Sequence, residues 1–550
     1  MEPVGLAVAC AGAFQQLFEI ALAAKKAIDA AKNFGDEAIK LQDALGAHRA
    51  RATALQGLLF DPFGDTAPGQ EIASTGSQLF DEIPEYVQLA IVDCLRQCDR
   101  VETARYPSLE GYQRTGMEAK VGMKSLDHLN ESPEEIMQRK ARTATLAKWA
   151  IKDRKKMKKM VEEYGSWISM AFQLVRDYLL IVETNDRRLT ALEKSRPAAA
   201  LGLAQDARLR RITAYEAVPP DVRIIKLDLD MRDLDIGEQE APAEEAAEEL
   251  TSSLQKLSVQ GQLMLVEYHE YTVDISATAI GSVPPLVHEQ VGQLAALMQS
   301  PKPAEFLALQ STGLLHQPAL NRFAFFYEIP GNPSFLQMEN LEQIVQKHQF
   351  LKPSLTQRVW LARRLVGAVA NFHTVGWIHK SLRSANVVFF RQSWPEYAPF
   401  PDDGFSNLRI CGFEYSRPSQ PGVGSLRYAD SSIARNVYRH PERWGKPAKY
   451  FMPQHDFYAL GVILLEIGLW ESVFSLQSHR FKNWRENPEL VRQRILEHTR
   501  TRLAAAAGEE YAKVVLLCLT VKSPWEDDSG VEIQAWFQTN VVESLEGVAC

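Results

Sequence analysis

Two short segments carry the residues whose types and spacing could support chemistry. They are WIHKSLRSANVVFF at Trp377–Phe390 and LRICGFE at Leu408–Glu414. The first segment places an imidazole at His379, a hydroxyl at Ser381 and an amide at Asn386 between apolar residues that favour β structure. A serine hydroxyl does not accept a proton as a carboxylate does. Gly412 in the second segment has no side chain with which to hold a cation.

The spacing His-x-x-Leu-x-x-x-Asn, followed about two dozen residues later by a second short apolar strand, resembles the catalytic loop and metal-binding turn of protein kinases. In this resemblance Ser381 replaces the acidic base of H-R-D, and Gly412 replaces the metal-binding Asp of D-F-G. Phe413 keeps the aromatic position, and Glu414 replaces the glycine. The loss of both acidic groups predicts a kinase-like domain without catalysis, a pseudokinase.

Three residues of this loop are matched by type. The resemblance implies that His379 is part of the loop scaffold and that Asn386 stands at the second metal position. One remaining ligand does not make a site for a hard cation, so we expect both to act as hydrogen-bonding parts of the loop. Arg383, in the usual Lys position, is either a surface cation or a group that binds an anion such as phosphate.

The nucleotide-binding part of the resemblance is weaker. No Gly-rich loop precedes Gln262, and the strand position of the nucleotide-pairing Lys is best matched by His269 in LVEYHEY. We therefore expect no ATP or Mg²⁺ as cofactor and no metal site. The alternative is an unorthodox active Ser/Thr kinase, in which Glu414 supplies a displaced carboxylate.

The resemblance to the kinase fold covers residues 255–548, with a small lobe at about 255–330 and a larger lobe at about 331–548. In the small lobe the pattern predicts a strand, a helix and two strands, at 262–273, 287–298, 306–315 and 322–329. In the larger lobe an amphipathic helix at Ser354–His373 leads into the His379 loop. A segment similar to A-P-E begins at Tyr438, and in the helix that follows it Asp456 would anchor the loop backbone.

Residues 1–215 show helical periodicity almost throughout, which predicts an all-α bundle of roughly five or six helices. The first helix, at Val4–Ala24, has a wide apolar stripe that includes Leu6, Phe14 and Leu17. It is either a core helix of a soluble bundle or an element that packs in the resting protein and enters a membrane when several copies shelter their polar residues. Further helices are predicted at 36–59, 86–104, 132–160 and 161–193.

A basic cluster lies in the second half of this region. Its members include Lys148, Lys152, Lys155, Lys156 and Lys159. An anionic lipid surface attracts such a helix at about 1 kcal/mol per nearby cation. The alternative is an ordinary solvated helix face. No nucleic-acid-binding motif accompanies the cluster and the net charge is −8, so we expect no nucleic-acid partner.

The N-terminal region resembles the fungal HeLo domain, the helical bundle of heterokaryon-incompatibility and prion-inhibition proteins. The resemblance rests on three stretches: MEPVGLAVACAGAF at the start, the amphipathic pattern at Ile39–Leu59, and KWAIKDRKKMKKMVEEY at Lys148–Tyr164. It implies a bundle that targets and permeabilises membranes, with the N-terminal helix as the inserting element. It also implies a role in incompatibility or regulated cell death.

Residues 216–254 separate the two regions and are rich in acidic residues, especially at Asp228–Glu249. Such a segment repels itself and buries little surface, which predicts an exposed linker. The six cysteines form no C-x-x-C pair, and the chain opens Met-Glu-Pro without a basic stretch before an apolar one. These features predict a cytoplasmic protein that is recruited to a membrane on activation.

Together the patterns predict a multidomain protein, an all-α bundle followed by an α+β, two-lobed kinase-like fold. Its function would be signalling, in which the pseudokinase-like domain regulates a membrane-active bundle. Expected partners are an anionic membrane surface, other copies of the bundle, and an activating protein or ligand at the kinase-like domain. An active kinase that uses the bundle to dock substrates, and a scaffold without membrane activity, remain the alternatives.

Overall fold

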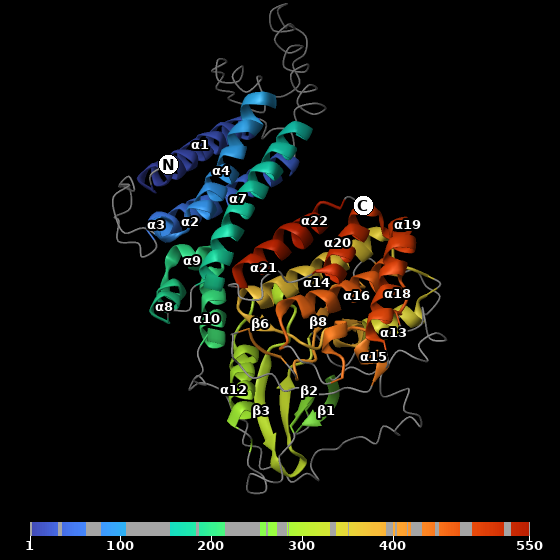
Figure 1. Ribbon diagram of the computed structural model, residues 1–550. Helices are drawn as coiled ribbons and strands as arrows, with labels where there is room; N and C mark the ends of the chain where they lie inside the picture. Colours follow the sequence, from blue (N-terminus) through green and yellow to red (C-terminus); the bar gives the residue numbers. More distant parts are fainter. Residues whose placement is uncertain are drawn as a thin grey trace, which may run out of the picture. The chain divides into compact units, whose positions relative to one another are not determined.

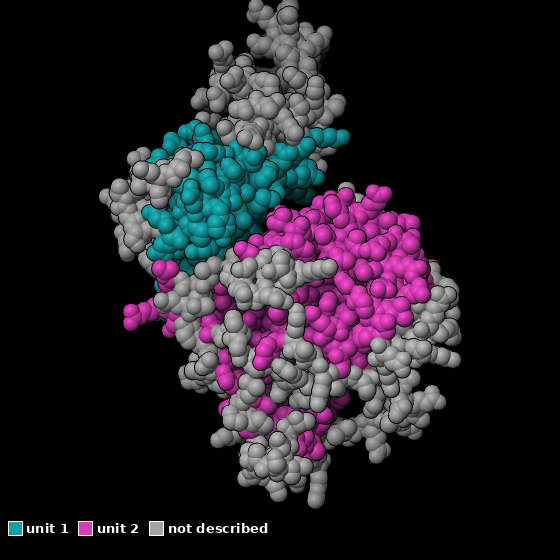
Figure 2. Space-filling model, viewed as in Figure 1, with its two compact units in different colours: residues 1–179, 190–204 teal, residues 180–189, 205–550 magenta. Residues whose placement is uncertain are grey.

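The computed structural model describes the chain in these ranges: 3–30, 36–61, 79–105, 154–182, 186–214, 254–259, 262–271, 283, 285–330, 337–349, 351–391, 400–401, 404–414, 416–419, 432–445, 450–473, 487–521 and 530–548. It divides into two compact units (Figure 2). Unit 1 comprises residues 1–179 and 190–204, and unit 2 comprises residues 180–189 and 205–550. The chain is mostly helical, with helices in the N-terminal region and small antiparallel sheets in the C-terminal region (Figure 1).

The N-terminal helices carry the apolar stripes that their periodicity predicts. Their bounds are α1 Pro3–Ala30, α2 Asp36–Phe60, α3 Leu79–Glu82, α4 Glu85–Arg105, α7 Arg154–Val182, α8 Asp186–Lys194, α9 Arg196–Ala200 and α10 Leu203–Ala214. In unit 1, α1 packs against α2 and α4. Phe14 of α1 contacts Phe60 of α2 edge to face, and Phe60 stacks on Phe80 of α3. Tyr164 of α7 donates a hydrogen bond to the carbonyl of Leu17 at 3.4 Å.

One predicted helix boundary is wrong. The helices expected at 132–160 and 161–193 meet inside α7, which continues through Met160 and Val161. No proline or glycine lies between Arg154 and Tyr164, so nothing in the local sequence ends the helix there. Residues 132–153 of the first predicted segment lie outside the described ranges.

Unit 2 contains a four-stranded antiparallel sheet with the strand order β1-β2-β4-β3. Its strands are β1 Leu254–Val259, β2 Gln262–Glu270, β3 Ser311–Gln317 and β4 Arg322–Tyr327, and the helix α12 Pro285–Gln299 contacts β3 (Figure 1). The strand β1 was not predicted. The strand predicted at 306–315 begins later, because the 3₁₀ turn η3 Ala304–Phe306 ends in a left-handed residue at Leu307. Ser311 and Gly313 then form a bulge in β3.

The remaining strands of unit 2 form two small sheets. Their orders are β5-β7-β8, from Gln337–Asn340, Val387–Arg391 and Leu408–Ile410, and β6-β9, from Trp377–Ile378 and Arg417–Pro418. The larger helices are α13 Leu341–Lys347, α14 Leu355–Thr374, α16 Pro453–Leu469, α18 Pro488–His498, α20 Glu509–Thr520 and α21 Gly530–Phe537. Short turns of helix complete the unit: η4 Pro318–Leu320, η5 Ser384–Asn386, α15 Ile433–Asn436, η6 Pro441–Arg443, η8 Thr499–Leu503, α19 Ala504–Ala507, η9 Gln538–Glu543 and α22 Ser544–Glu546.

A single large apolar core fills unit 2. It includes Leu265 and Tyr271 from the β2 region, Phe372 from α14, Phe413, and Phe457 from α16. Within it, α14 packs against α16, and α16 packs against α20. A smaller cluster of Leu257, Val266, Ala324 and Phe326 covers the opposite face of the four-stranded sheet. Leu265 and Val266 belong to different clusters because successive side chains of a strand point to opposite faces of the sheet.

The compact units do not follow the predicted division at residue 215. Leu209 and Ile212 of α10 belong to the core of unit 2, and the Thr213 hydroxyl donates to the Val375 carbonyl at 2.5 Å. The predicted linker at 216–254 lies outside the described residues, apart from Leu254 at the start of β1. Its limits therefore stay a prediction. Among the helices that the structure describes, none combines the length and the apolar character that a membrane crossing requires.

Candidate functional site

The predicted loop follows α14, whose start is set by its own sequence. The Ser354 hydroxyl accepts the Gln357 amide, and the Gln357 side chain accepts the Ser354 amide, which is a capping box. The helix ends at Thr374, and the chain turns through Gly376 at φ +75° into β6. This positive φ favours glycine, and a Cβ atom at Gly376 would also displace the end of the Arg210 side chain. The loop from His379 to Asn386 then leads into β7.

Asp456 of α16 holds the first residues of this loop. Its carboxylate accepts the backbone amides of His379 and Lys380 at 2.8 and 2.9 Å, and Nε2 of His373 lies 3.0 Å away. Lys380 has φ +66°, a conformation that is unfavourable for a side-chain-bearing residue. Burial alone would raise the pKa of Asp456, but the bonds from His373 and the backbone outweigh it and lower the pKa. Asp456 therefore holds the backbone of the loop, as the sequence predicts.

His379 is buried and acts within the loop itself. Its Nε2 lies 3.1 Å from the Cys411 carbonyl, and its Nδ1 accepts the backbone amide of Ser381 at 3.2 Å. This pairing places the ring proton on Nε2 and uses both nitrogens. Burial is the main cause that lowers the pKa of His379, which keeps the ring neutral. His379 thus connects the two segments and has no ring nitrogen left for a ligand.

The side chain of Asn386 fills the space that a side chain at Gly412 would need. Nδ2 of Asn386 donates to the Ser381 carbonyl at 2.8 Å, and the Cys411 amide donates to the Asn386 carbonyl at 3.0 Å. Gly412 has φ +82°, and a Cβ atom there would overlap the Asn386 side-chain amide. The structure therefore requires glycine at 412, and an aspartate could not be placed there without moving Asn386. Oδ1 of Asn386 is buried without a hydrogen-bond partner among the described residues.

Glu267 is a residue of this candidate site that the sequence prediction missed. It lies in the middle of β2, 1% exposed, and its carboxylate accepts the backbone amides of Gly412 at 3.1 Å and Phe413 at 2.8 Å. His269 Nε2 lies 2.8 Å from the same carboxylate. Burial alone would raise the pKa of Glu267, but the bonds from His269, Gly412 and Phe413 outweigh it and lower the pKa. A charged residue inside the apolar run LMLVEY was the signal available in the sequence.

The remaining predicted residues lie around this carboxylate. His269 is buried against the Phe325 ring, with 4.4 Å between ring centroids. Phe413 packs on His379 at 4.5 Å and on Phe372 at 5.4 Å. Burial raises the pKa of Glu414, and the nearby charge of Glu267 acts in the same direction. The site therefore brings together residues from β2, the loop after β6 and the turn after β8.

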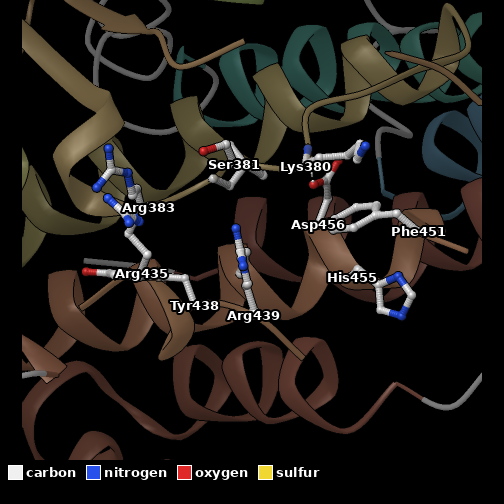
Figure 3. Close-up of a pocket in the computed structure, with 11 residues that line it drawn as sticks. Lys380, Ser381, Arg383, Arg435, Tyr438, Arg439, Phe451, His455 and Asp456 are labelled. Carbon is white, nitrogen blue, oxygen red and sulfur yellow. Dashed lines mark hydrogen bonds between the residues drawn. The ribbon is translucent and has the colours of Figure 1, made fainter. Parts of the chain in front are cut away.

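A pocket is lined by residues of the loop, of the segment at α15 and of α16 (Figure 3). It is partly open to solvent and encloses only about 20 Å³. Its lining residues are Lys380, Ser381, Leu382, Arg383, Arg435, Tyr438, Arg439, Phe451, His455, Asp456 and Ala459. Arg383, predicted as a cation able to bind an anion, is thus placed beside two further arginines. We refer to this feature as the basic pocket.

The residues proposed for membrane contact lie in unit 1 and in α7. Leu6, Phe14 and Leu17 are each at most 1% exposed, so α1 turns its predicted stripe into the bundle. Lys155 and Lys159 are exposed on α7, and Lys159 lies 3.6 Å from Glu163. The side chain of Lys156 and the whole of Lys148 and Lys152 lie outside what the structure describes.

One group of side chains in the described part of the chain has the composition of a metal site. His440, Glu442 and His455 have ligand atoms within 4.8 Å of one another. His455 Nδ1 accepts the Met452 amide at 2.8 Å, and its Nε2 lies 2.5 Å from Glu442. Both nitrogens of His455 are therefore engaged, Nδ1 with the backbone at the start of α16 and Nε2 with Glu442 of η6.

The chain was compared with known proteins. No protein-family model matches it, and no curated protein is significantly similar to it.

Proposed function

We propose that this chain is a non-catalytic signalling protein, in which a two-lobed, pseudokinase-like unit 2 regulates a membrane-active helical bundle of the HeLo type. The order of elements in unit 2 supports a kinase-like fold. Two strands, a helix and two strands precede α14, and the loop after β6 is anchored by Asp456. The proposed bundle begins with α1 and includes the basic residues of α7.

The position of the Glu267 carboxylate is the observation that supports a lack of catalysis in this proposal. In an active kinase the turn at Gly412 would present a carboxylate to Mg²⁺. Here the Gly412 and Phe413 amides bind a buried carboxylate, and Asn386 fills the space of a side chain at 412. A second buried anion beside Glu267 would be repelled, since neither would be hydrated. Glu414 follows this turn, and burial together with the charge of Glu267 raises the pKa of its carboxyl, which disfavours a second carboxylate there.

A nucleotide assay tests this part. Purified full-length chain with ATP and Mg²⁺ should show no rise in melting temperature and no phosphate incorporation. The variant Asn386→Ala should behave like the unmodified chain in both measurements. Phosphate incorporation that disappears in Asn386→Ala would establish the alternative, an unorthodox active kinase.

A vesicle assay tests the membrane part. Full-length chain should release dye from vesicles that contain phosphatidylserine, and should release little from vesicles of phosphatidylcholine alone. Val8 and Leu22 are 55% and 44% exposed on α1, so replacing them does not disturb the bundle core. Val8→Glu and Leu22→Glu should each reduce release by at least fivefold, because a charge opposes insertion.

Ile39 on α2, 50% exposed, provides the matched control. Ile39→Glu adds the same charge to an exposed helix position outside α1 and should leave release within twofold. If the unmodified chain releases no dye under any lipid composition, the membrane activity is removed from the proposal and the scaffold alternative remains.

A further inference from the structure

Two carboxyl groups are buried together in unit 2, and the proposed function does not use them. Glu342 belongs to α13 and Glu466 to the second half of α16, and these residues are 5% and 1% exposed. Both are bound by the segment that follows α16. The Ser472 hydroxyl lies 3.5 Å from a carboxyl oxygen of Glu342, and the Val473 amide donates to Glu466 at 2.8 Å. Two buried carboxylates in one site repel each other, so such a pair favours the uptake of a proton.

Glu466 is the more firmly held of the two groups. The Tyr438 hydroxyl lies 3.0 Å from each of its carboxyl oxygens, and the Ser384 hydroxyl of η5 and one backbone amide also donate to it. Among the described residues, the hydrogen-bonding group at the Glu342 carboxyl is the Ser472 hydroxyl, at a distance beyond the usual range for an O–H···O bond. A repulsion between the two carboxylates would therefore displace Glu342 first.

Burial and charge both favour the protonated form of this pair. Burial is the main cause that raises the pKa of Glu466 to about 8, and the charge of Glu342 acts in the same direction. Burial also raises the pKa of Glu342 to about 7, although the charge of Arg383 opposes this rise. Burial and the charges of both carboxyl groups raise the pKa of the Tyr438 hydroxyl, which keeps it neutral. A single positive charge at Arg383 does not balance two buried carboxylates.

We propose that Glu342 and Glu466 form a proton-binding pair that keeps a proton at neutral pH, and that loss of this proton loosens the contact between α13 and the end of α16. With the proton in place, the pair carries at most one negative charge, which the donors at Glu466 stabilise. Without it, two negative charges repel each other where water is excluded. Unit 2 would thereby respond to pH close to neutrality. This inference goes beyond the proposed function and holds whether or not unit 2 transfers phosphate.

The effect of pH on stability has a definite sign. A carboxyl group whose pKa is raised by folding stabilises the folded chain fully below its ordinary pKa, near 4.5, and this contribution is lost as the pH rises through the folded pKa. The folded pKa values of about 7 and about 8 place the end of this loss near pH 8. The unfolding equilibrium constant should therefore rise from about pH 5 to about pH 8, by up to about tenfold per pH unit for each proton that the folded chain retains.

Chemical denaturation of the full-length chain across this range tests the proton-binding pair, in buffer without ATP and without lipid. Glu342→Gln and Glu466→Gln each remove one titrating group and nearly keep the shape of the side chain. Relative to either variant, the unfolding equilibrium constant of the unmodified chain should rise at least about tenfold between about pH 5 and about pH 8. An infrared difference spectrum should show a protonated carboxyl group near neutral pH in the unmodified chain, and a weaker signal in Glu466→Gln.

Glu510→Gln is the matched control. The Glu510 side chain is 68% exposed on α20 and lies 3.8 Å from Lys513. Its replacement removes the same charge outside the buried pair and should leave the ratio of the equilibrium constants within about twofold across the range.

Hydrogen exchange tests the loosened contact. The Trp470 indole N–H donates to the His348 carbonyl at 3.2 Å, which joins the end of α16 to the end of α13. Its protection factor should fall at least about tenfold between about pH 6 and about pH 8 in the unmodified chain. In Glu342→Gln no second negative charge forms beside Glu466, so the protection factor should stay within about twofold.

Parallel pH profiles for the unmodified chain and both glutamine variants would overturn the proton-binding pair, and so would an equal change in Glu510→Gln. Profiles that differ while the Trp470 indole keeps its protection at both pH values would reject the loosened contact. Because neither ATP nor lipid is present, the nucleotide and vesicle assays can reject the proposed function without changing these results.

Discussion

At the scale of residues, two side chains hold the turn at Gly412. Glu267 takes the amides of Gly412 and Phe413, and Asn386 fills the space beside Gly412. A buried carboxylate with three charge-assisted or backbone hydrogen bonds is stable there because its lost hydration is replaced. The turn is therefore held by a buried carboxylate of the protein itself.

Gly412→Asp should destabilise the chain and restore no phosphoryl transfer. The new side chain would overlap Asn386 and would stand at φ +82°. We expect a loss of about 2 to 4 kcal/mol in the free energy of unfolding, measured by denaturant titration. Gly445 has φ +65° and nothing within 4 Å of an added Cβ atom, so Gly445→Asp isolates the backbone contribution. Equal losses at both positions would contradict the role given to Asn386.

Glu267→Gln should cost about 3 kcal/mol at neutral pH, because an amide cannot accept both backbone amides and also pair with His269. The folded pKa of Glu267 is lowered, so its contribution is present above its ordinary pKa, near 4.5, and is lost as the pH falls through the folded pKa. The stability of the unmodified chain should therefore fall more steeply below about pH 5 than that of Glu267→Gln.

Chemical denaturation across this pH range measures the difference. Glu497→Gln is the control, since Glu497 is 55% exposed and pairs with Arg494 on the surface of α18. It should change stability by less than about 0.5 kcal/mol at any pH. Parallel pH profiles for the unmodified chain and Glu267→Gln would count against the buried carboxylate as a charged group.

At the scale of elements, α16 positions the loop through two carboxylates, Asp456 near its start and Glu466, which accepts the Ser384 hydroxyl. Its Asp456 fixes two consecutive amides, and one of these belongs to Lys380 in its left-handed conformation. The helix is held in turn by α14 and α20, both of which pack against it. The geometry of the basic pocket therefore depends on helix packing as much as on the loop sequence.

Asp456→Ala should cost about 3 to 5 kcal/mol, because it leaves two buried amides and His373 without their acceptor. Asp456→Asn keeps one acceptor oxygen and should cost clearly less. Hydrogen exchange should show faster exchange of the His379 and Lys380 amides in the alanine variant. Unchanged protection of these amides would show that the loop holds its conformation without α16.

At the scale of the whole molecule, the testable feature of the proposed bundle is the positive charge on the surface of α7, and not the length of an apolar helix. Leu6, Phe14 and Leu17 are buried, whereas Lys155, Lys158 and Lys159 are on the surface of α7. Lys158 and Lys159 lie near Glu162 and Glu163 one turn further along, so part of their charge is already balanced. Attraction to a lipid surface would act on this face before α1 leaves the core.

Replacing Lys155, Lys158 and Lys159 together by glutamine should weaken binding to anionic vesicles by about 100-fold, at about 1 kcal/mol per cation. Vesicle sedimentation measures this, and raising the salt from about 0.15 M to about 1 M should remove most of the difference, because the Debye length falls from about 8 Å to about 3 Å. A control with Arg494, Arg500 and Lys513 replaced changes the net charge equally. Equal weakening in the control would indicate non-specific attraction.

The local patterns of the chain were predicted well. The periodicity of Ser354–His373 predicted α14 within one residue, and the strand at Arg322 and the helix at Val287 were also found. The strand β1 was not predicted, and it is stabilised by pairing with β2. The helix α10 lies within the predicted helical region, but its packing into the core of unit 2 was not predicted. Neither effect leaves a periodic signal in the local sequence.

The sequence by itself determined that the loop has no acidic group at Ser381 and no side chain at Gly412, since residue type and spacing are local properties. Only the tertiary structure decided that Glu267, 145 residues before Gly412, binds the turn, and that Arg435 and Arg439 join Arg383 in one pocket. These are contacts between distant segments, whose proximity comes from the folding of the common core. Their chemistry depends on burial and charge at that contact, which no single stretch of sequence contains.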